Sequence, residues 1–163
     1  MLAHGELEVV NAGIVIECTA HEVVINGGEI VAPDELRAKD LTFKTCSANG
    51  ANCTLAENTI LTLALHGLAE LHGTLGTLIK ALPLPSKTFA AIDFEGATCA
   101  LQGIQPITGT VDILAPEGRD PKLLQLVNVF SLTGSLKVGS SEGKLLGLHA
   151  DLRLVSDETW NFL

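Results

Sequence analysis

The sequence predicts an all-β protein, a mostly antiparallel β-sandwich or barrel with about ten short strands and little helix. Segments in which apolar and polar residues alternate recur roughly every ten residues along the chain. Turn-forming residues separate these segments, and the 16 glycines supply many of the turns. No long segment has the apolar spacing of an amphipathic helix. Because each strand would have one apolar and one polar face, we expect antiparallel pairing in a single domain over residues 1–163.

The N-terminal segment, residues 1–13, is predicted to be an arm or a strand, because residues 6–10 alternate before a turn at Asn11-Ala12-Gly13. The polar residues 32–40 include Pro33 and allow a helical turn. Further strands are predicted where residues alternate or are β-branched, at residues 14–19, 22–25, 29–31, 41–45, 58–65, 88–94, 97–101, 107–114, 122–130, 132–138 and 144–155.

Alternation within these segments predicts which side chains share a face. Ile14, Ile16 and Cys18 lie on one face of their strand, and Leu41 and Phe43 are expected to point inward. In residues 58–65, one face would hold Ile60, Thr62 and Ala64, and the other Leu61, Leu63 and Leu65.

Two further predictions concern a hairpin and a segment whose periodicity is ambiguous. Residues 88–94 and 97–101 flank Glu95-Gly96, which is typical of a hairpin turn. Residues 122–130 fit a helical face as well as a strand, and we expect a strand.

The four cysteines are an even number and show neither a CxxC nor a zinc-site spacing, so we expect disulfides at Cys18, Cys46, Cys53 and Cys99. Buried free thiols are the alternative. The Asn49-Gly50 turn can bring Cys46 and Cys53 to the ~5.5 Å Cα separation of a disulfide, which leaves Cys18 to pair with Cys99. Other pairings stay open, because four cysteines allow three connectivities.

Composition excludes several partners. The net charge is −9 and no basic cluster occurs, so nucleic acid and anionic membrane surfaces are disfavoured. No apolar run approaches the ~20 residues of a membrane-spanning helix. The chain has five Phe, one Trp and no Tyr, which counts against an aromatic face for recognising sugars.

Cysteine-centred motifs occur in a recognisable order: I-x-C at 16–18, L-x-F-x-x-C at 41–46 followed by Cys53, I-x-T-x-x-L-x-G at 60–67, and F-x-x-x-x-F-x-G-x-x-C at 89–99. This order resembles a loose group of small secreted bacterial all-β proteins known mainly as hypothetical proteins, over roughly residues 14–113. The resemblance implies export and paired cysteines and offers no catalytic residue. MLAHGELEVV lacks the basic and apolar segments of a secretory signal, so an exported chain would be a mature form or would begin after the signal.

Other candidate sites are weaker. Asp93 and Glu95 share a strand face and could form a glycosidase pair, but a solvent-facing pair is the more common arrangement. Residues 139–144 superficially resemble a phosphate-binding loop and are interpreted as a hairpin turn. The histidines are interpreted as scattered surface residues and not as metal ligands: His4, His21, His66, His72 and His149. We expect no catalysis, no cofactor and no metal site.

We therefore expect an extracellular or cell-surface structural subunit, such as a filament, coat or surface-layer protein, that forms a homo-oligomer or filament. Aliphatic content without recognition aromatics and long alternating strands favour this role, and residues 6–10 could pair with the sheet edge of another copy. The alternative is that they pair within their own sheet. The second function hypothesis is a ligand-binding β module for a glycan or a small apolar ligand.

Overall fold

The computed structural model describes residues 4–19, 24–32, 34–115 and 125–152, and every regular element within them is a β-strand. The predicted all-β, antiparallel fold is confirmed, with strands that are more numerous and shorter than expected. The strands are β1 (His4–Val9), β2 (Ile14–Cys18), β3 (Val24–Asn26), β4 (Glu29–Ala32), β5 (Glu35–Ala38), β6 (Asp40–Lys44), β7 (Cys46–Asn49), β8 (Thr54–Leu55), β9 (Thr59–Leu61), β10 (Leu65–Gly73), β11 (Gly76–Pro83), β12 (Thr88–Glu95), β13 (Gly103–Gly109), β14 (Val111–Ala115), β15 (Gln125–Phe130), β16 (Leu136–Val138) and β17 (Ser141–Leu152).

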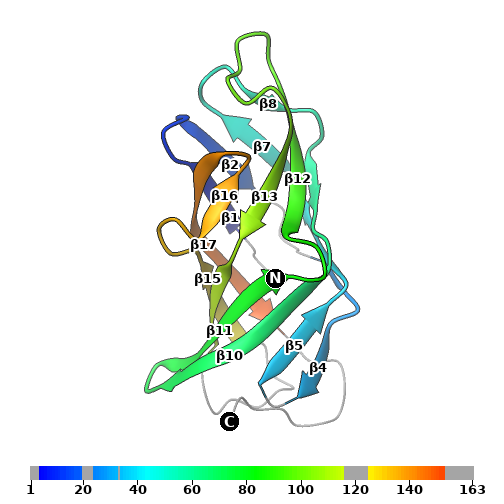
Figure 1. Ribbon diagram of the computed structural model, residues 1–163, viewed down its shortest axis with the longest axis vertical. Helices are drawn as coiled ribbons and strands as arrows, with labels where there is room; N and C mark the ends of the chain where they lie inside the picture. The colour runs from blue at the N-terminus through cyan, green and yellow to red at the C-terminus, as the bar shows by residue number, and fades with distance from the viewer. Residues whose placement is uncertain (1–3, 20–23, 33, 116–124, 153–163) are drawn as a thin grey trace.

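Most strands belong to one large sheet that curls into a nearly closed, barrel-like shape (Figure 1). Its order is β4-β5-β10-β11-β14-β15-β17-β16-β13-β12-β8, with β1, β2 and β7 branching from β17. A separate three-stranded sheet has the order β3-β6-β9. In the orientation of Figure 1, we call β2, β7, β8, β12, β13 and β16 the upper half, and β4, β5, β10, β11, β14 and β15 the lower half.

The long strand β17 joins the two halves. Its first residues pair with β16, with Ser141 opposite Val138, and its last residues pair with β15, with Leu152 opposite Gln125. On its other edge β17 pairs with β1. The N-terminal segment is therefore a strand inside its own sheet, and β1 uses both edges because it also pairs with β2.

The single strand predicted over residues 107–114 is wrong, because the chain passes from the upper to the lower half at Gly109 and forms β13 and β14. Gly109 has φ +114°, and a Cβ there would lie 1.9 Å from the Ser135 carbonyl oxygen. The Thr110 N–H donates to that same oxygen at 2.7 Å. Only glycine allows this close approach between two crossing segments.

Two other local predictions also need correction. The strand expected at residues 97–101 is a pair of turns, in which the Cys99 N–H donates to the Gly96 carbonyl, and β13 is the strand that pairs with β12. The helical turn allowed within residues 32–40 is not formed by the described residues, since Ala32 ends β4, residues 35–38 form β5, and these two strands pair with each other. The strand preferred for 122–130 is confirmed from Gln125 onward. Residues 22–23, 122–124 and 153–155 of predicted strands, and His21, lie outside the described residues.

The main core fills the upper half. Its most completely buried members come from four strands and include Val9, Ile14, Ile16, Phe94 and Val138, each at most 2% exposed. A smaller cluster around Ile79 and Ala115 lies in the lower half. The predicted inward face of β2 is thus confirmed, because Ile14 and Ile16 are among the core residues.

All four cysteines form disulfides, but the preferred pairing of Cys46 with Cys53 and Cys18 with Cys99 is wrong. Cys18 bonds to Cys46, and Cys53 bonds to Cys99. Cys18 and Cys46 are direct cross-strand neighbours on β2 and β7, with Cα atoms 4.0 Å apart. Strand β7 itself keeps Cys46 away from Cys53, because four extended residues span about 10 Å, beyond the reach of a disulfide.

The connectivity gives a first prediction. The disulfides close loops of 28 and 46 residues, so loop entropy assigns them about 3.6 and 4 kcal/mol respectively. We expect Cys18→Ala with Cys46→Ala, and separately Cys53→Ala with Cys99→Ala, each to lower the free energy of unfolding by about 2–4 kcal/mol in denaturant titrations. Peptide mapping without reduction checks the pairing itself, and a peptide linking Cys46 to Cys53 would contradict this structure.

Candidate functional site

An apolar cavity of about 190 Å³, partly open to solvent, lies in the barrel-like sheet where the upper and lower halves meet. Its lining residues come from twelve strands, namely β1, β2, β6 and β9 to β17, and from Thr62, which follows β9. The lining residues are Gly5, Leu7, Ile16, Cys18, Leu41, Phe43, Ile60, Thr62, Leu65, Ala81, Phe89, Ala90, Ile107, Val111, Ile113, Val129, Leu136 and Leu145.

The cavity exists because large side chains meet small ones at this level. Ala81 of β11 and Ala90 of β12 are buried in the wall, and Gly5 contributes no side chain from β1. Core side chains such as Leu136 and Ile107 fill the space on the upper side. Protein interiors are normally packed to the density of organic crystals, so a void of this size is unusual within a small domain.

The wall of the cavity is almost wholly hydrocarbon. Among its lining residues, the only side chains with a polar atom or sulfur are Thr62 and Cys18. The Thr62 hydroxyl oxygen accepts the Leu41 N–H at 2.8 Å, and the Thr62 N–H donates to the Leu41 carbonyl at 2.9 Å. The Cys18 sulfur is in the disulfide with Cys46. The cavity thus offers a ligand dispersion contacts and hydrophobic transfer, with no charged side chain among its lining residues.

Part of this site was predictable from alternation. Leu41 and Phe43 were expected to point inward, and both line the cavity. Ile60 and Thr62 lie on one face as predicted, whereas Leu61 and Leu63 are exposed. Leu65 was expected on the same face as Leu61 and Leu63, but it lines the cavity. The face changes because β9 ends at Leu61 and a new strand, β10, begins at Leu65. Ala81 and Ala90 were not predicted as cavity residues. A small side chain marks a cavity only when the side chains packed around it in space are known.

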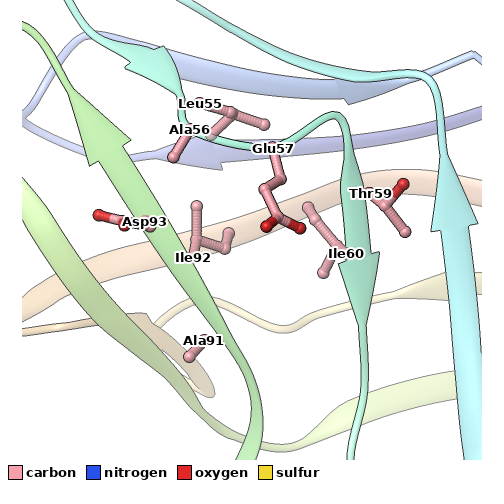
Figure 2. A pocket seen from close by; sticks show the side chains of 8 residues that line it. All are labelled: Leu55, Ala56, Glu57, Thr59, Ile60, Ala91, Ile92 and Asp93. Atoms are coloured by element: carbon pink, nitrogen blue, oxygen red, sulfur yellow. The ribbon is translucent and has the colours of Figure 1, made fainter.

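A second, more polar pocket of about 160 Å³ lies between β12 and the segment from β8 to β9 (Figure 2). It contains two carboxylates, Glu57 and Asp93, and Figure 2 shows their side chains pointing apart. Asp93 and Glu95, the pair considered from the sequence, are both exposed on β12. Neither pair of carboxylates converges on a common point in a closed site.

The remaining candidate residues are dispersed. Within the described part of the chain, no group of three or more His, Cys, Asp or Glu side chains is placed to hold a metal ion. His66 Nδ1 lies 3.3 Å from Glu35 Oε1, and Glu35 also pairs with Arg37. The backbones of His4 and His149 are cross-strand neighbours on β1 and β17. The hairpin turn predicted at residues 139–144 is confined to residues 139 and 140, because β17 begins at Ser141 and pairs with β16 from there.

A cluster of charged side chains, Lys80, Glu70 and Asp112, lies on the face of β10, β11 and β14 that is opposite the cavity. Lys80 Nζ donates to Glu70 Oε2 at 2.9 Å, and this hydrogen bond raises the pKa of the Lys80 ammonium group, with smaller contributions from the charges of Glu70 and Asp112. Asp112, the cross-strand neighbour of Lys80, is 1% exposed and its Oδ2 has no hydrogen-bond partner within the described structure. This cluster points away from the cavity, because Val111 and Ile113 on either side of Asp112 line it.

Comparison with protein-family models, with curated proteins and with solved structures finds no match to this chain.

None of the described residues forms a helix with the length and apolar character needed to cross a membrane.

The cavity predicts opposite effects for one methylene added at two valines, the half-buried Val111 in the cavity wall and the fully buried Val138 in the core. Val111→Ile places the extra group in the cavity and should raise the free energy of unfolding by about 0.8 kcal/mol. Val138→Ile places it in filled space, since Val138 is fully buried and a Cβ on Gly143 would lie 3.2 Å from its Cγ2. The Val138→Ile substitution should therefore lower the free energy of unfolding by about 1–3 kcal/mol. Chemical denaturation of both variants tests this prediction. Equal decreases in the free energy of unfolding would show that the cavity cannot accommodate an added methylene.

Proposed function

We propose that this protein is a binding module that holds a small apolar ligand inside its barrel-like sheet. The observation that carries the proposal is the cavity, whose volume of about 190 Å³ exceeds the ~150 Å³ of an engineered apolar cavity known to bind benzene. Closed or nearly closed antiparallel sheets commonly enclose their ligands in this way.

A glycan is less well supported as the ligand. Sugar sites generally present an aromatic face together with hydrogen-bonding groups. Here Phe89 and Phe94 are buried, Phe43 and Phe130 are partly buried, and the cavity wall has almost no free polar atoms. An apolar ligand matches these surroundings better.

The two disulfides are consistent with an extracellular or otherwise oxidising environment. We extend this to an extracellular or cell-surface location for the binding module. Such a location agrees with the export implied by the resemblance of the cysteine motifs.

Ligand binding is tested by thermal unfolding with toluene as the probe, beside a panel of sugars. A ligand present at a hundred times its Kd stabilises the fold by about 2.7 kcal/mol, which raises Tm by roughly 5–10 °C in a domain of this size. We expect toluene to produce such a shift and the sugars to produce none. If toluene leaves Tm unchanged at its solubility limit, the proposal is wrong.

Two neighbouring alanines on β12 provide a matched control. Ala90 is buried in the cavity wall, whereas Ala91 is exposed on the opposite face. Ala90→Leu should fill part of the cavity and reduce the toluene shift, and Ala91→Leu should keep it. Ala81→Leu fills the cavity from β11 and repeats the test if the first variant does not fold.

Self-association is a second candidate function, favoured by exposed leucines around the segment between β9 and β10. Leu61 and Leu63 are 56% and 48% exposed, and Leu84, whose N–H donates to the Ala64 carbonyl, is 38% exposed. Exposed apolar clusters of this kind are typical of protein–protein contacts. Exchange of the N-terminal strand has less support, because β1 would have to leave both β2 and β17.

Light scattering after size exclusion tests self-association on the non-reduced protein. We expect a mass above the 17.1 kDa of one chain. A combined Leu61→Lys and Leu63→Lys variant should return the mass to that of a monomer. A monomer in the unaltered protein would remove self-association and leave ligand binding as the remaining proposal.

A further inference from the structure

We infer that the cavity selects small uncharged hydrocarbons, namely a single ring with a short alkyl substituent or a chain of similar volume, and rejects ligands that bury a polar or charged group. This inference rests on the proposed function and specifies its ligand class. Volume, wall chemistry and surrounding charge support it independently.

Volume sets the size of the ligand. A cavity of about 190 Å³ is only modestly larger than the ~150 Å³ cavity that takes benzene. A benzene ring with one or two added carbons therefore fits, whereas a long acyl chain or a fused multi-ring lipid does not. Each methylene that enters unfilled apolar space should strengthen binding about fourfold, and the gain should end where the cavity is full.

Wall chemistry excludes a buried polar group. Thr62 is the only lining residue with a side-chain hydroxyl, and its oxygen already accepts the Leu41 N–H. The strands around the cavity have partners on both edges except β9, which pairs with β6 alone. The N–H groups of Thr62 and Leu63, which follow β9, donate to the Leu41 and Phe89 carbonyls. A ligand hydroxyl placed inside would exchange its several bonds to water for at most one, with the Thr62 hydroxyl, and a buried polar group with incomplete partners is costly.

Surrounding charge disfavours anions in particular. Glu6 and Glu17 are direct cross-strand neighbours on β1 and β2. They alternate with Gly5, Leu7, Ile16 and Cys18, which line the cavity. The whole chain carries a net charge of −9. Because no cationic side chain lines the cavity, a carboxylate held there would lose its hydration without gaining an opposite charge, so fatty acids and aromatic acids should be rejected.

The test uses probes of nearly equal shape: ethylbenzene, benzyl alcohol, benzylammonium and benzoate, with Kd measured by titration calorimetry or by ligand-detected NMR. We expect ethylbenzene to bind about tenfold or more tightly than benzyl alcohol, and the two ions to bind more weakly still. Benzyl alcohol binding as tightly as ethylbenzene would overturn the inferred ligand class while leaving the proposed binding function intact. No binding by any of the four, or by toluene, would overturn both.

An alkyl series measures the size limit. From toluene through ethylbenzene and propylbenzene to hexylbenzene, we expect Kd to fall about fourfold per carbon at first and then to stop falling. Phe43→Ala enlarges the cavity at a half-buried lining position and should move that limit to a longer chain. Val31→Ala, an exposed position on β4 outside the cavity, should leave it unchanged. A constant gain up to hexylbenzene, or the same limit in Phe43→Ala, would overturn the inferred size class.

Discussion

Closure of the large sheet at β7 is the constraint on which the upper half of this structure depends. By hydrogen bonding β7 pairs with one strand, β2, so its other side must be held in a different way. The Cys18–Cys46 disulfide ties the start of β7 to β2, and Cys53–Cys99 ties the turn after β7 to the loop after β12. Backbone contacts support this junction, since a Cβ on Gly96 would lie 2.1 Å from the Asn52 carbonyl oxygen. The Cys53–Cys99 disulfide and the hydrogen bond from the Cys46 N–H to the Asn58 carbonyl thus hold the side of β7 that the strand ladder leaves open, while Cys18–Cys46 reinforces the ladder itself.

The cavity follows from how the two halves share β17. The upper half is packed with large buried side chains such as Phe94 and Ile14, while the lower half has a separate, smaller cluster around Ile79. Where the chain passes between the halves, near Gly109 and between β9 and β10, strands end and restart in a new direction. Side chains on either side of such a break cannot interdigitate as they do along a continuous strand. The space left between them has an apolar wall because the inward positions of every contributing strand are apolar.

The same division explains why the polar candidates remain unconnected. Asp93 and Glu70 are exposed on β12 and β10, and Glu57 lies in the connection between β8 and β9. The side chains that line the cavity are aliphatic or phenyl groups, apart from Thr62 and the disulfide-bonded Cys18.

The sequence by itself determined the β class, the antiparallel pairing and the inward faces of Ile14, Ile16, Leu41 and Phe43, because a period of two is a local property that each strand carries alone. It also indicated that all four cysteines are paired, since their number and context carry that information. Tertiary structure decided the pairing itself, because sequence distance does not show that Cys46 lies directly across from Cys18 while a strand separates it from Cys53. It also decided the break at Gly109 and the cavity beside Ala81 and Ala90, since empty space is a relation among segments far apart in the chain.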